Sequence, residues 1–298
     1  MKIFVTGATG YIGGSVAERL VALGHQVSGL TREASKTSLL KERGIEAVVG
    51  TLDDAEILAF AAAAADAVIH TASADHAGSV VTLVSALERT GKTLVHTSGS
   101  AVVGDTAAGE HPPTVTYTDD AYFEPIPFRR PSAAMNRFVR QAAIDKGIRS
   151  FVICPPMIYG EGRGLNPDSI QIPKLLAFSK KAGAGVYFGK GLNRYSNVYI
   201  DDVVDLYVLA LEKAAGGSFY FAENGSASFK EIAEMISHSM GFGGKTISVS
   251  IEDLVRQSGE RGKGVTVNSL VSAVNARRLG WSPHGPSLSE YFESLSKK

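Results

Sequence analysis

Short apolar runs alternate with helical patterns through the first half of the chain, and this alternation restricts the fold more than any other feature of the sequence. The runs are rich in Val and Ile and nearly continuous, which is typical of strands buried on both faces. The predicted strands are residues 3–5, 26–30, 46–49, 67–70, 93–96 and 150–153. The predicted helices are residues 12–23, 35–43, 55–64, 78–89 and 131–146. Repeated strand–helix units predict an α/β fold with a doubly wound parallel sheet.

A turn with three spaced glycines follows the first predicted strand and opens the first predicted helix. Gly7 permits the tight turn, Gly10 lets the backbone approach a pyrophosphate, and Gly13 lets the helix pack close to the strand. The free N–H groups and partial positive charge at the helix N-terminus attract phosphates. A purely structural turn is the alternative, but the strand–turn–helix context favours a dinucleotide site on a Rossmann-type domain.

The pattern changes after residue 160, where the chain becomes glycine-rich and irregular. A helical stretch is expected around residues 172–180, a strand near 198–200, and a helix over 203–214. We therefore predict a Rossmann domain over residues 1–160, to which residues 196–222 return. A smaller, discontinuous C-terminal substrate lobe is predicted over residues 161–195 and 223–298.

The charge balance and cysteine content narrow the function classes. Lys plus Arg and Asp plus Glu are equal at 30 each, so nothing favours binding to nucleic acid or to an anionic membrane. No apolar run approaches the roughly 20 residues that span a bilayer. Cys154 is the single cysteine and cannot form an internal disulfide. Because the chain has no such apolar run and no internal disulfide, a cytoplasmic protein is expected. His70, His76 and His96 lack a metal-ligand spacing, so no metal site is predicted.

Several motifs resemble the extended and atypical branches of the short-chain dehydrogenase/reductase superfamily, the relatives of NAD-dependent epimerases and dehydratases. The GxxGxxG spacing of residues 6–13 (TGATGYIG) carries the first resemblance, and the others follow in order along the chain. They are HTAS at residues 70–73, HTSGS at 96–100, CPPMIYG at 154–160, YIDDV at 199–203 and RLGWSP at 278–283. The resemblance covers nearly the whole chain.

This resemblance implies a set of cofactor contacts at the ends of the predicted strands. The residues 70–73 pass under the cofactor, the residues 96–100 carry an active-site Ser or Thr, and the residues 154–160 lie beside the nicotinamide. Together with the glycine turn, the implied cofactor-binding residues are Gly7, Thr9, Gly10, Tyr11, Ile12, Gly13, Thr31, Arg32, Leu52, Thr71, Ala72, Ser98, Pro155, Pro156 and Met157.

The end of the second predicted strand bears on the choice between NAD and NADP. An NAD site has Asp or Glu there to bind the ribose 2′-hydroxyl, whereas this chain reads Thr31-Arg32. A guanidinium binds a 2′-phosphate bidentately. We predict NADP(H) rather than NAD, with Arg32 as the phosphate ligand and Thr31, Ser35 or Lys36 as helpers. A solvated arginine at a helix start is the alternative. Leu52 is expected to pack against the adenine.

The chain departs from the family at the catalytic pair. The family uses Tyr-x-x-x-Lys to pass a proton while hydride moves. Counting back from Pro155 places Phe128 and Ser132 at these positions, and neither side chain can do that work. Arg129 or Arg130 is a substitute for the cation.

The proton donor and the polarising group also need substitutes. Tyr122, Tyr117 or Tyr159 is a candidate acid, and Ser98 or Ser100 a candidate to polarise a carbonyl. Of all these groups, we favour Ser98, Ser100, Tyr122 and Arg130 as catalytic. The alternative is that these side chains merely line the pocket or lie in solvent.

The leading functional hypothesis is an NADP(H)-dependent oxidoreductase that acts on a carbonyl or a conjugated bond of a small organic molecule. A non-catalytic NADP(H) sensor and a nucleotide-sugar epimerase or dehydratase are the alternatives. The substrate wall is expected from residues 117–130, 157–163 and 183–195. The helices over 78–89 and 131–146 allow a homodimer or a monomer.

Overall fold

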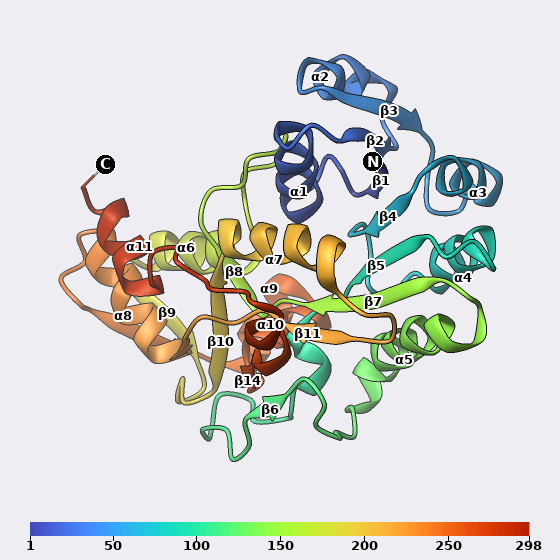
Figure 1. Cartoon of the computed structure of the whole chain (residues 1–298). Helices are drawn as coiled ribbons and strands as arrows, with labels where there is room; N and C mark the ends of the chain where they lie inside the picture. Colours follow the sequence, from blue (N-terminus) through green and yellow to red (C-terminus); the bar gives the residue numbers. More distant parts are fainter. Residues whose placement is uncertain (298) are drawn as a thin grey trace.

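A seven-stranded sheet dominates the computed structural model, which describes residues 1–297 (Figure 1). Its strands are β1 (Lys2–Thr6), β2 (Gln26–Thr31), β3 (Ile45–Val49), β4 (Ala67–His70), β5 (Thr93–Thr97), β7 (Arg149–Cys154) and β11 (Phe219–Phe221). The strand order is β11-β7-β5-β4-β1-β2-β3, and all neighbours are parallel. The order reverses between β1 and β4, and ligands bind at the carboxyl ends of the strands at such a point.

Helices cover both faces of this sheet. On one face α1 (Tyr11–Ala22) packs against α7 (Ile200–Lys213), and on the other α3 (Ala55–Ala64), α4 (Ala77–Leu87) and α5 (Arg130–Asp145) lie side by side (Figure 1). The short α2 (Thr37–Glu42) packs beside β3. The strands β4 and β5 are buried along their whole length, as parallel strands between two helix layers must be. The predicted doubly wound fold is confirmed.

The last strand of the sheet, β11, was not predicted. Its run of three residues is too short to be distinguished from a loop by periodicity. It is buried throughout and pairs with β7, Phe219 opposite Val152 and Phe221 opposite Cys154. The chain therefore returns to the main sheet after α7.

Smaller sheets and helices form the C-terminal lobe, as predicted. One sheet has the order β12-β10-β8, and a second pairs β13 with β9. Its elements are β8 (Met157–Tyr159), α6 (Gln171–Ala182), β9 (Gly185–Phe188), β10 (Arg194–Tyr199), β12 (Ser226–Ser228), α8 (Phe229–Ser239), β13 (Thr246–Val249), α9 (Ile251–Ser258), η4 (Glu260–Val265) and α11 (Leu288–Leu295). These elements enclose a second apolar cluster that includes Tyr159, Phe188, Phe229 and Phe292.

The remaining short elements lie between the main sheet and the lobe or beside α2 and α5. They are η1 (Ala34–Lys36), η2 (Ser100–Val103), β6 (Tyr117–Thr118), η3 (Pro127–Arg129), β14 (Val271–Ser272) and α10 (Val274–Leu279). Among residues 1–297, no helix is long and apolar enough to cross a membrane.

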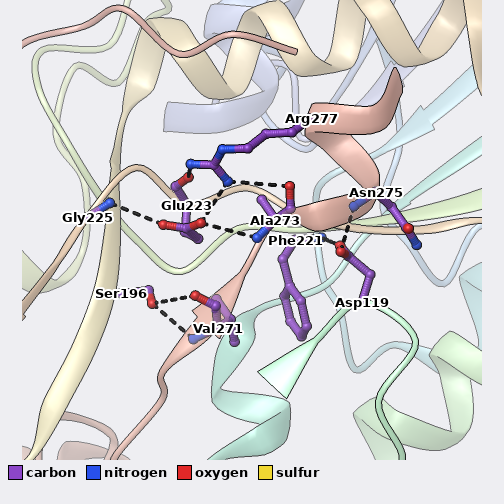
Figure 2. Close-up of polar contacts among 9 residues, drawn as sticks. All are labelled: Asp119, Ser196, Phe221, Glu223, Gly225, Val271, Ala273, Asn275 and Arg277. Atoms are coloured by element: carbon purple, nitrogen blue, oxygen red, sulfur yellow. Dashed lines mark hydrogen bonds and ion pairs between the residues drawn. The ribbon is translucent and has the colours of Figure 1, made fainter. Parts of the chain in front are cut away.

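The buried carboxylate of Asp119 ties the C-terminal segment to the main sheet, and the Ser196 hydroxyl ties it to β10 of the lobe (Figure 2). Asp119 accepts hydrogen bonds from the backbone N–H of Phe221 in β11 (2.6 Å) and of Asn275 in α10 (2.8 Å). The Ser196 hydroxyl in β10 exchanges two hydrogen bonds with the backbone of Val271 in β14. Segments more than 100 residues apart thereby share one anchor.

Candidate active site

The glycine turn between β1 and α1 has the geometry of a phosphate cradle. Gly7 has a positive φ of +78°, which only glycine adopts readily, and Gly10 donates its N–H to the Gly7 carbonyl at 2.8 Å. A Cβ on Gly13 would collide with the Gly7 carbonyl and the Thr71 hydroxyl, so the helix packs directly on the strand end. No acidic residue lies in the first turn of α1. Its N-terminus is therefore suited to an anion.

A cavity of about 970 Å³ opens onto this turn and extends along the carboxyl ends of the strands. It brings together most of the residues for which cofactor contacts were predicted, namely Gly7, Thr9, Gly10, Tyr11, Ile12, Gly13, Arg32, Leu52, Thr71, Ala72, Ser98, Pro155 and Pro156. Thr31 and Met157 lie outside the lining. The Thr31 hydroxyl accepts the N–H of Glu33, and Met157 is fully buried in the second apolar cluster.

Arg32 lines the cavity, as do Leu52, Asp53 and His76. Its guanidinium is exposed and makes no hydrogen bond or ion pair with the residues that the structure describes. Asp53 instead contacts His76, with 3.2 Å between Oδ1 and Nε2. Asp53 belongs to the loop between β3 and α3. This part of the lining therefore combines an exposed cation, Arg32, with the apolar surface of Leu52.

Ser98 and Ser100 line the middle of the cavity, after β5. The Ser98 hydroxyl accepts a hydrogen bond from Asn136 Nδ2 at 2.9 Å, and the Ser100 hydroxyl lies 2.7 Å from that of Ser269. The Asn136 Oδ1 atom is buried without a hydrogen-bond partner. Asn136 was missed by sequence reasoning, although it lies one helical turn after Ser132 on the same face of α5.

Tyr122 and Arg130, the other two favoured catalytic candidates, do not line the cavity. The Tyr122 side chain is 87% exposed and donates to Glu124, which also lies 3.8 Å from Arg130. Arg129, the residue before Arg130, does line the cavity. The reason is local, because Arg129 ends η3 and Arg130 begins α5, so the two side chains leave the backbone in different directions.

The positions that replace the family's Tyr and Lys hold no acid and no cation. The Phe128 ring is 62% exposed beneath the Arg129 guanidinium, and the Ser132 hydroxyl donates to Asp75. The other tyrosine candidates lie outside the lining as well. Tyr159 is buried and donates to the Pro286 carbonyl, and Tyr117 packs edge-on against Phe123.

The far wall of the cavity differs from the wall expected from the sequence. Of the expected segments only Arg129, Ile158 and Tyr195 reach the lining. Residues 166–178, at the start of α6, and residues 254–265, from α9 and η4, supply most of the rest. Its apolar part comes from Leu175, Phe178, Leu254 and Val265, and Lys174 adds a cation. No sequence motif marked these side chains.

The family is decided by a match that covers most of the chain. The model of the NAD dependent epimerase/dehydratase family matches residues 3–220. The chain belongs to this family. The resemblance drawn from the motifs is confirmed, and membership implies a nicotinamide dinucleotide as the cofactor of this oxidoreductase.

Relatives at full length and over the main domain agree with the family. The oxidase ucsJ of an Acremonium species is 31% identical, covering 100% of this chain and 97% of its own. The 2-alkyl-3-oxoalkanoate reductase of Stenotrophomonas maltophilia is 29% identical, over 76% of this chain and 71% of its own. UDP-glucose 4-epimerase of Thermotoga maritima superposes with a TM-score of 0.80 at 18% identity, covering 100% and 98% of the two chains, and this likeness shows the fold alone.

The family's cofactor fits the residues present. The turn that a Cβ would fill, the uncapped N-terminus of α1 and the cavity along the strand ends suit a pyrophosphate and its two nucleosides. When bound, the nicotinamide supplies hydride chemistry. The residues around Ser98 and Pro155 would hold that ring, and Arg32 and Leu52 the adenosine. Among residues 1–297, no group of three or more His, Cys, Asp or Glu side chains is placed to hold a metal ion.

A pair of buried histidines supports the floor of this family member's site. His70 and His96 end neighbouring strands, face each other across the sheet register, and stack with ring centroids 5.6 Å apart. Burial lowers the pKa of His70 to about 4 and that of His96 to about 3. Both nitrogens of His96 lack a hydrogen-bond partner among the described residues. Both rings are therefore neutral at physiological pH.

Proposed function

We propose that the protein is an NADP(H)-dependent reductase that acts on a carbonyl group of a small, largely apolar organic molecule. The observation that carries the proposal is the single cavity that joins the glycine turn and a free Arg32 to an apolar end. A bound dihydronicotinamide supplies hydride at such a site. The chain's own residues bind the phosphates, orient the carbonyl near Ser98, and exclude water with apolar side chains.

The preference for NADP(H) rests on the end of β2. Arg32 lines the cavity and has no ion partner among the side chains that the structure describes, so its guanidinium can bind a 2′-phosphate. β2 ends at Thr31, where NAD sites place a carboxylate. A guanidinium–phosphate contact stabilises binding strongly because it is charge-assisted and bidentate.

The character of the substrate follows from the far wall. Leu175, Phe178 and Leu254 favour an apolar group, while Arg129 and Lys174 offer positive charge beside it. A nucleotide-sugar substrate would need several cations for its diphosphate, whereas this wall offers Arg129 and Lys174 together with the carboxylate of Asp168. The arginines that flank α6 in the sequence are Arg163 and Arg194, and neither lines the cavity. Arg163 pairs with Asp201 at 2.7 Å, and Arg194 pairs with Glu231 at 2.9 Å.

The test has two steps, binding and turnover. Quenching of protein fluorescence should give a lower Kd for NADPH than for NADH, and Arg32→Asp should reduce that preference about 10- to 100-fold. Arg130→Asp is the matched control, because Arg130 is an exposed arginine outside the cavity. An unchanged preference in Arg32→Asp would refute the NADP(H) assignment.

Turnover is measured as loss of NADPH absorbance with ethyl benzoylacetate, a 3-oxo ester that carries an apolar ring. We expect one equivalent of alcohol for each NADPH consumed. Tight NADPH binding without consumption, with this ester and with a panel of ketones and enones, would favour the second candidate, a cofactor-binding sensor. The specific observation behind that candidate is the replacement of the Tyr and Lys positions by Phe128 and Ser132.

A further inference from the structure

Three hydroxyl groups and one guanidinium meet where the cofactor half of the cavity joins its apolar end. Ser100, Tyr195 and Arg129 line the cavity there, and Ser269 lies behind Ser100. The Ser100 and Ser269 hydroxyl oxygens are 2.7 Å apart, and Ser269 also donates to the Ser100 carbonyl at 2.8 Å. The Ser100 oxygen is thereby held with its lone pairs available to a further donor.

The ring of Tyr195 is fixed from several sides. Its strand β10 pairs with β12 and β8, and its backbone bridges to Ser269. The ring packs edge-on against Phe229 with centroids 6.1 Å apart, and only 2% of the residue is exposed. A tyrosine so held presents its hydroxyl to the cavity in one orientation.

No other tyrosine of the described chain is placed to act on a substrate in this cavity. Tyr11 is the other tyrosine in the lining, and its hydroxyl donates to the Gly160 carbonyl at 2.8 Å, beside the phosphate turn. Tyr122 is exposed, and the Tyr159 hydroxyl is bound to Pro286. The acid that the family places at the position of Phe128, in η3, therefore has one candidate replacement in the described chain, Tyr195.

The charges around Tyr195 suit a phenol that gives up a proton only during reaction. Burial raises the pKa of Tyr195, which keeps the hydroxyl protonated at neutral pH. The positive charge of Arg129 and the hydroxyls of Ser269 and Ser100 act in the opposite direction and favour the tyrosinate. Among the side chains that the structure describes, Glu260 and Arg261 not being among them, Arg129 forms no ion pair and its guanidinium lies over the Phe128 ring.

We propose that Tyr195 donates the proton to the carbonyl oxygen during reduction, with Arg129 holding the negative charge that develops on the phenol. This assignment rests on the proposed function. It places the acid on β10 of the C-terminal lobe rather than at the position of Phe128 in η3.

The electrons and atoms of this step balance. The carbonyl carbon accepts a hydride, and with it both electrons, from NADPH, so a C–H bond forms as the C=O double bond becomes single. The carbonyl oxygen takes the proton as the Tyr195 O–H bond breaks, which leaves an alcohol, NADP⁺ and a tyrosinate paired with Arg129. Water entering the open cavity returns the proton to the tyrosinate after the products leave.

The first experiment compares Tyr195→Phe with Tyr122→Phe, which removes the hydroxyl of an exposed tyrosine outside the cavity. With ethyl benzoylacetate as substrate, Tyr195→Phe should lower kcat by about 100-fold or more and leave the Kd for NADPH within about two-fold, because a general acid contributes to the transition state alone. Tyr122→Phe should match the unmodified protein. Wild-type kcat in Tyr195→Phe would overturn the inference and leave the proposed function standing.

The second experiment needs no turnover. The positive ring of bound NADP⁺ should favour the tyrosinate form of Tyr195, so adding NADP⁺ at alkaline pH should raise the ultraviolet absorbance of tyrosinate. Tyr195→Phe should abolish this rise, and Arg129→Met should shift it to higher pH, whereas Arg130→Met should not. If the rise persists in Tyr195→Phe or is absent from the unmodified protein, the assignment is wrong, even where no carbonyl compound is reduced.

Discussion

The two halves of the cavity are built in different ways. The cofactor half is formed by loops that each follow one strand of the main sheet, so its contacts come from short sequence segments at the ends of β1, β2, β4, β5 and β7. The apolar half gathers single side chains from α6, β10, α9 and η4, which are far apart in the sequence. In the cofactor half of the cavity, the same strand–loop geometry recurs at each strand end, so its contacts can be recognised as sequence motifs. In the apolar half of the cavity, the chemistry depends on individual side chains that no motif marks.

The halves should differ most in their response to acid. His70 and His96 lie beneath the cofactor half, with pKa values lowered by burial to about 4 and about 3. Because the unfolded chain binds protons near pH 6.5 and the folded chain does not, stability should fall as pH drops from about 6.5 towards 4. Each histidine should cost about 2 to 3 kcal/mol between about pH 7 and pH 4.5.

Urea unfolding at the two pH values measures this loss. His96→Leu should flatten the pH dependence by the share of one histidine, while His111→Leu, at an exposed position, should leave it unchanged. An identical acid loss in His96→Leu would mean that other groups control it.

A methyl group should be tolerated very unequally at two glycines of the same cavity. A Cβ on Gly13 would strike the Gly7 carbonyl and the Thr71 hydroxyl, whereas a Cβ on Gly99 meets nothing within 4 Å. Gly13→Ala should lower the free energy of unfolding by about 3 kcal/mol and weaken NADPH binding at least about 100-fold. Gly99→Ala should change the unfolding equilibrium constant and the Kd for NADPH by less than about two-fold each. Equal effects would contradict the packed cradle described above.

The anchor between the lobe and the sheet should have an intermediate effect. Asp119→Ala removes the acceptor of two backbone N–H groups, from Phe221 and Asn275, and should lower the free energy of unfolding by about 2 kcal/mol. Asp120→Ala removes only one exposed contact to the Asn275 amide and should cost less than about 0.5 kcal/mol. Thermal and urea unfolding of both variants check the difference. A large loss in Asp120→Ala alone would shift the anchor to the surface contact.

The smallest effect is expected in the apolar half. Phe178→Ala removes ring surface from the cavity and should raise KM for ethyl benzoylacetate about 5- to 10-fold, since roughly 1 kcal/mol of apolar burial is lost. The Kd for NADPH should stay the same. Phe60→Ala, on the 80% exposed ring in α3, is the control. A change in cofactor affinity with unchanged KM would mean that the two halves are not separable.

The helical and strand periodicity of the first half predicted the sheet and its helices closely, because both periods report burial on a regular backbone. The strand β11 escaped prediction because three residues carry no period, and only pairing with β7 marks them as a strand. The helix predicted from residue 203 begins at Ile200, where the chain leaves β10 without an intervening loop.

Neighbouring residues show where sequence reasoning ends at the site. Arg129 and Arg130 have the same chemistry, and only the junction of η3 and α5 directs one into the cavity and the other towards Glu124. Tyr195 lay at the edge of an expected wall, but its approach to Ser100 and Ser269 depends on strands that meet only in the folded chain.

The sequence by itself determined the sheet, the phosphate cradle and the cation at the end of β2, because those features depend on local backbone conformation and on residues close in the chain. The tertiary structure alone decided which tyrosine and which arginine face the reacting centre and how apolar the far wall is. Those properties arise from contacts between residues as far apart in the chain as Ser100 and Ser269. A linear sequence pattern does not record which distant side chains are brought together by packing.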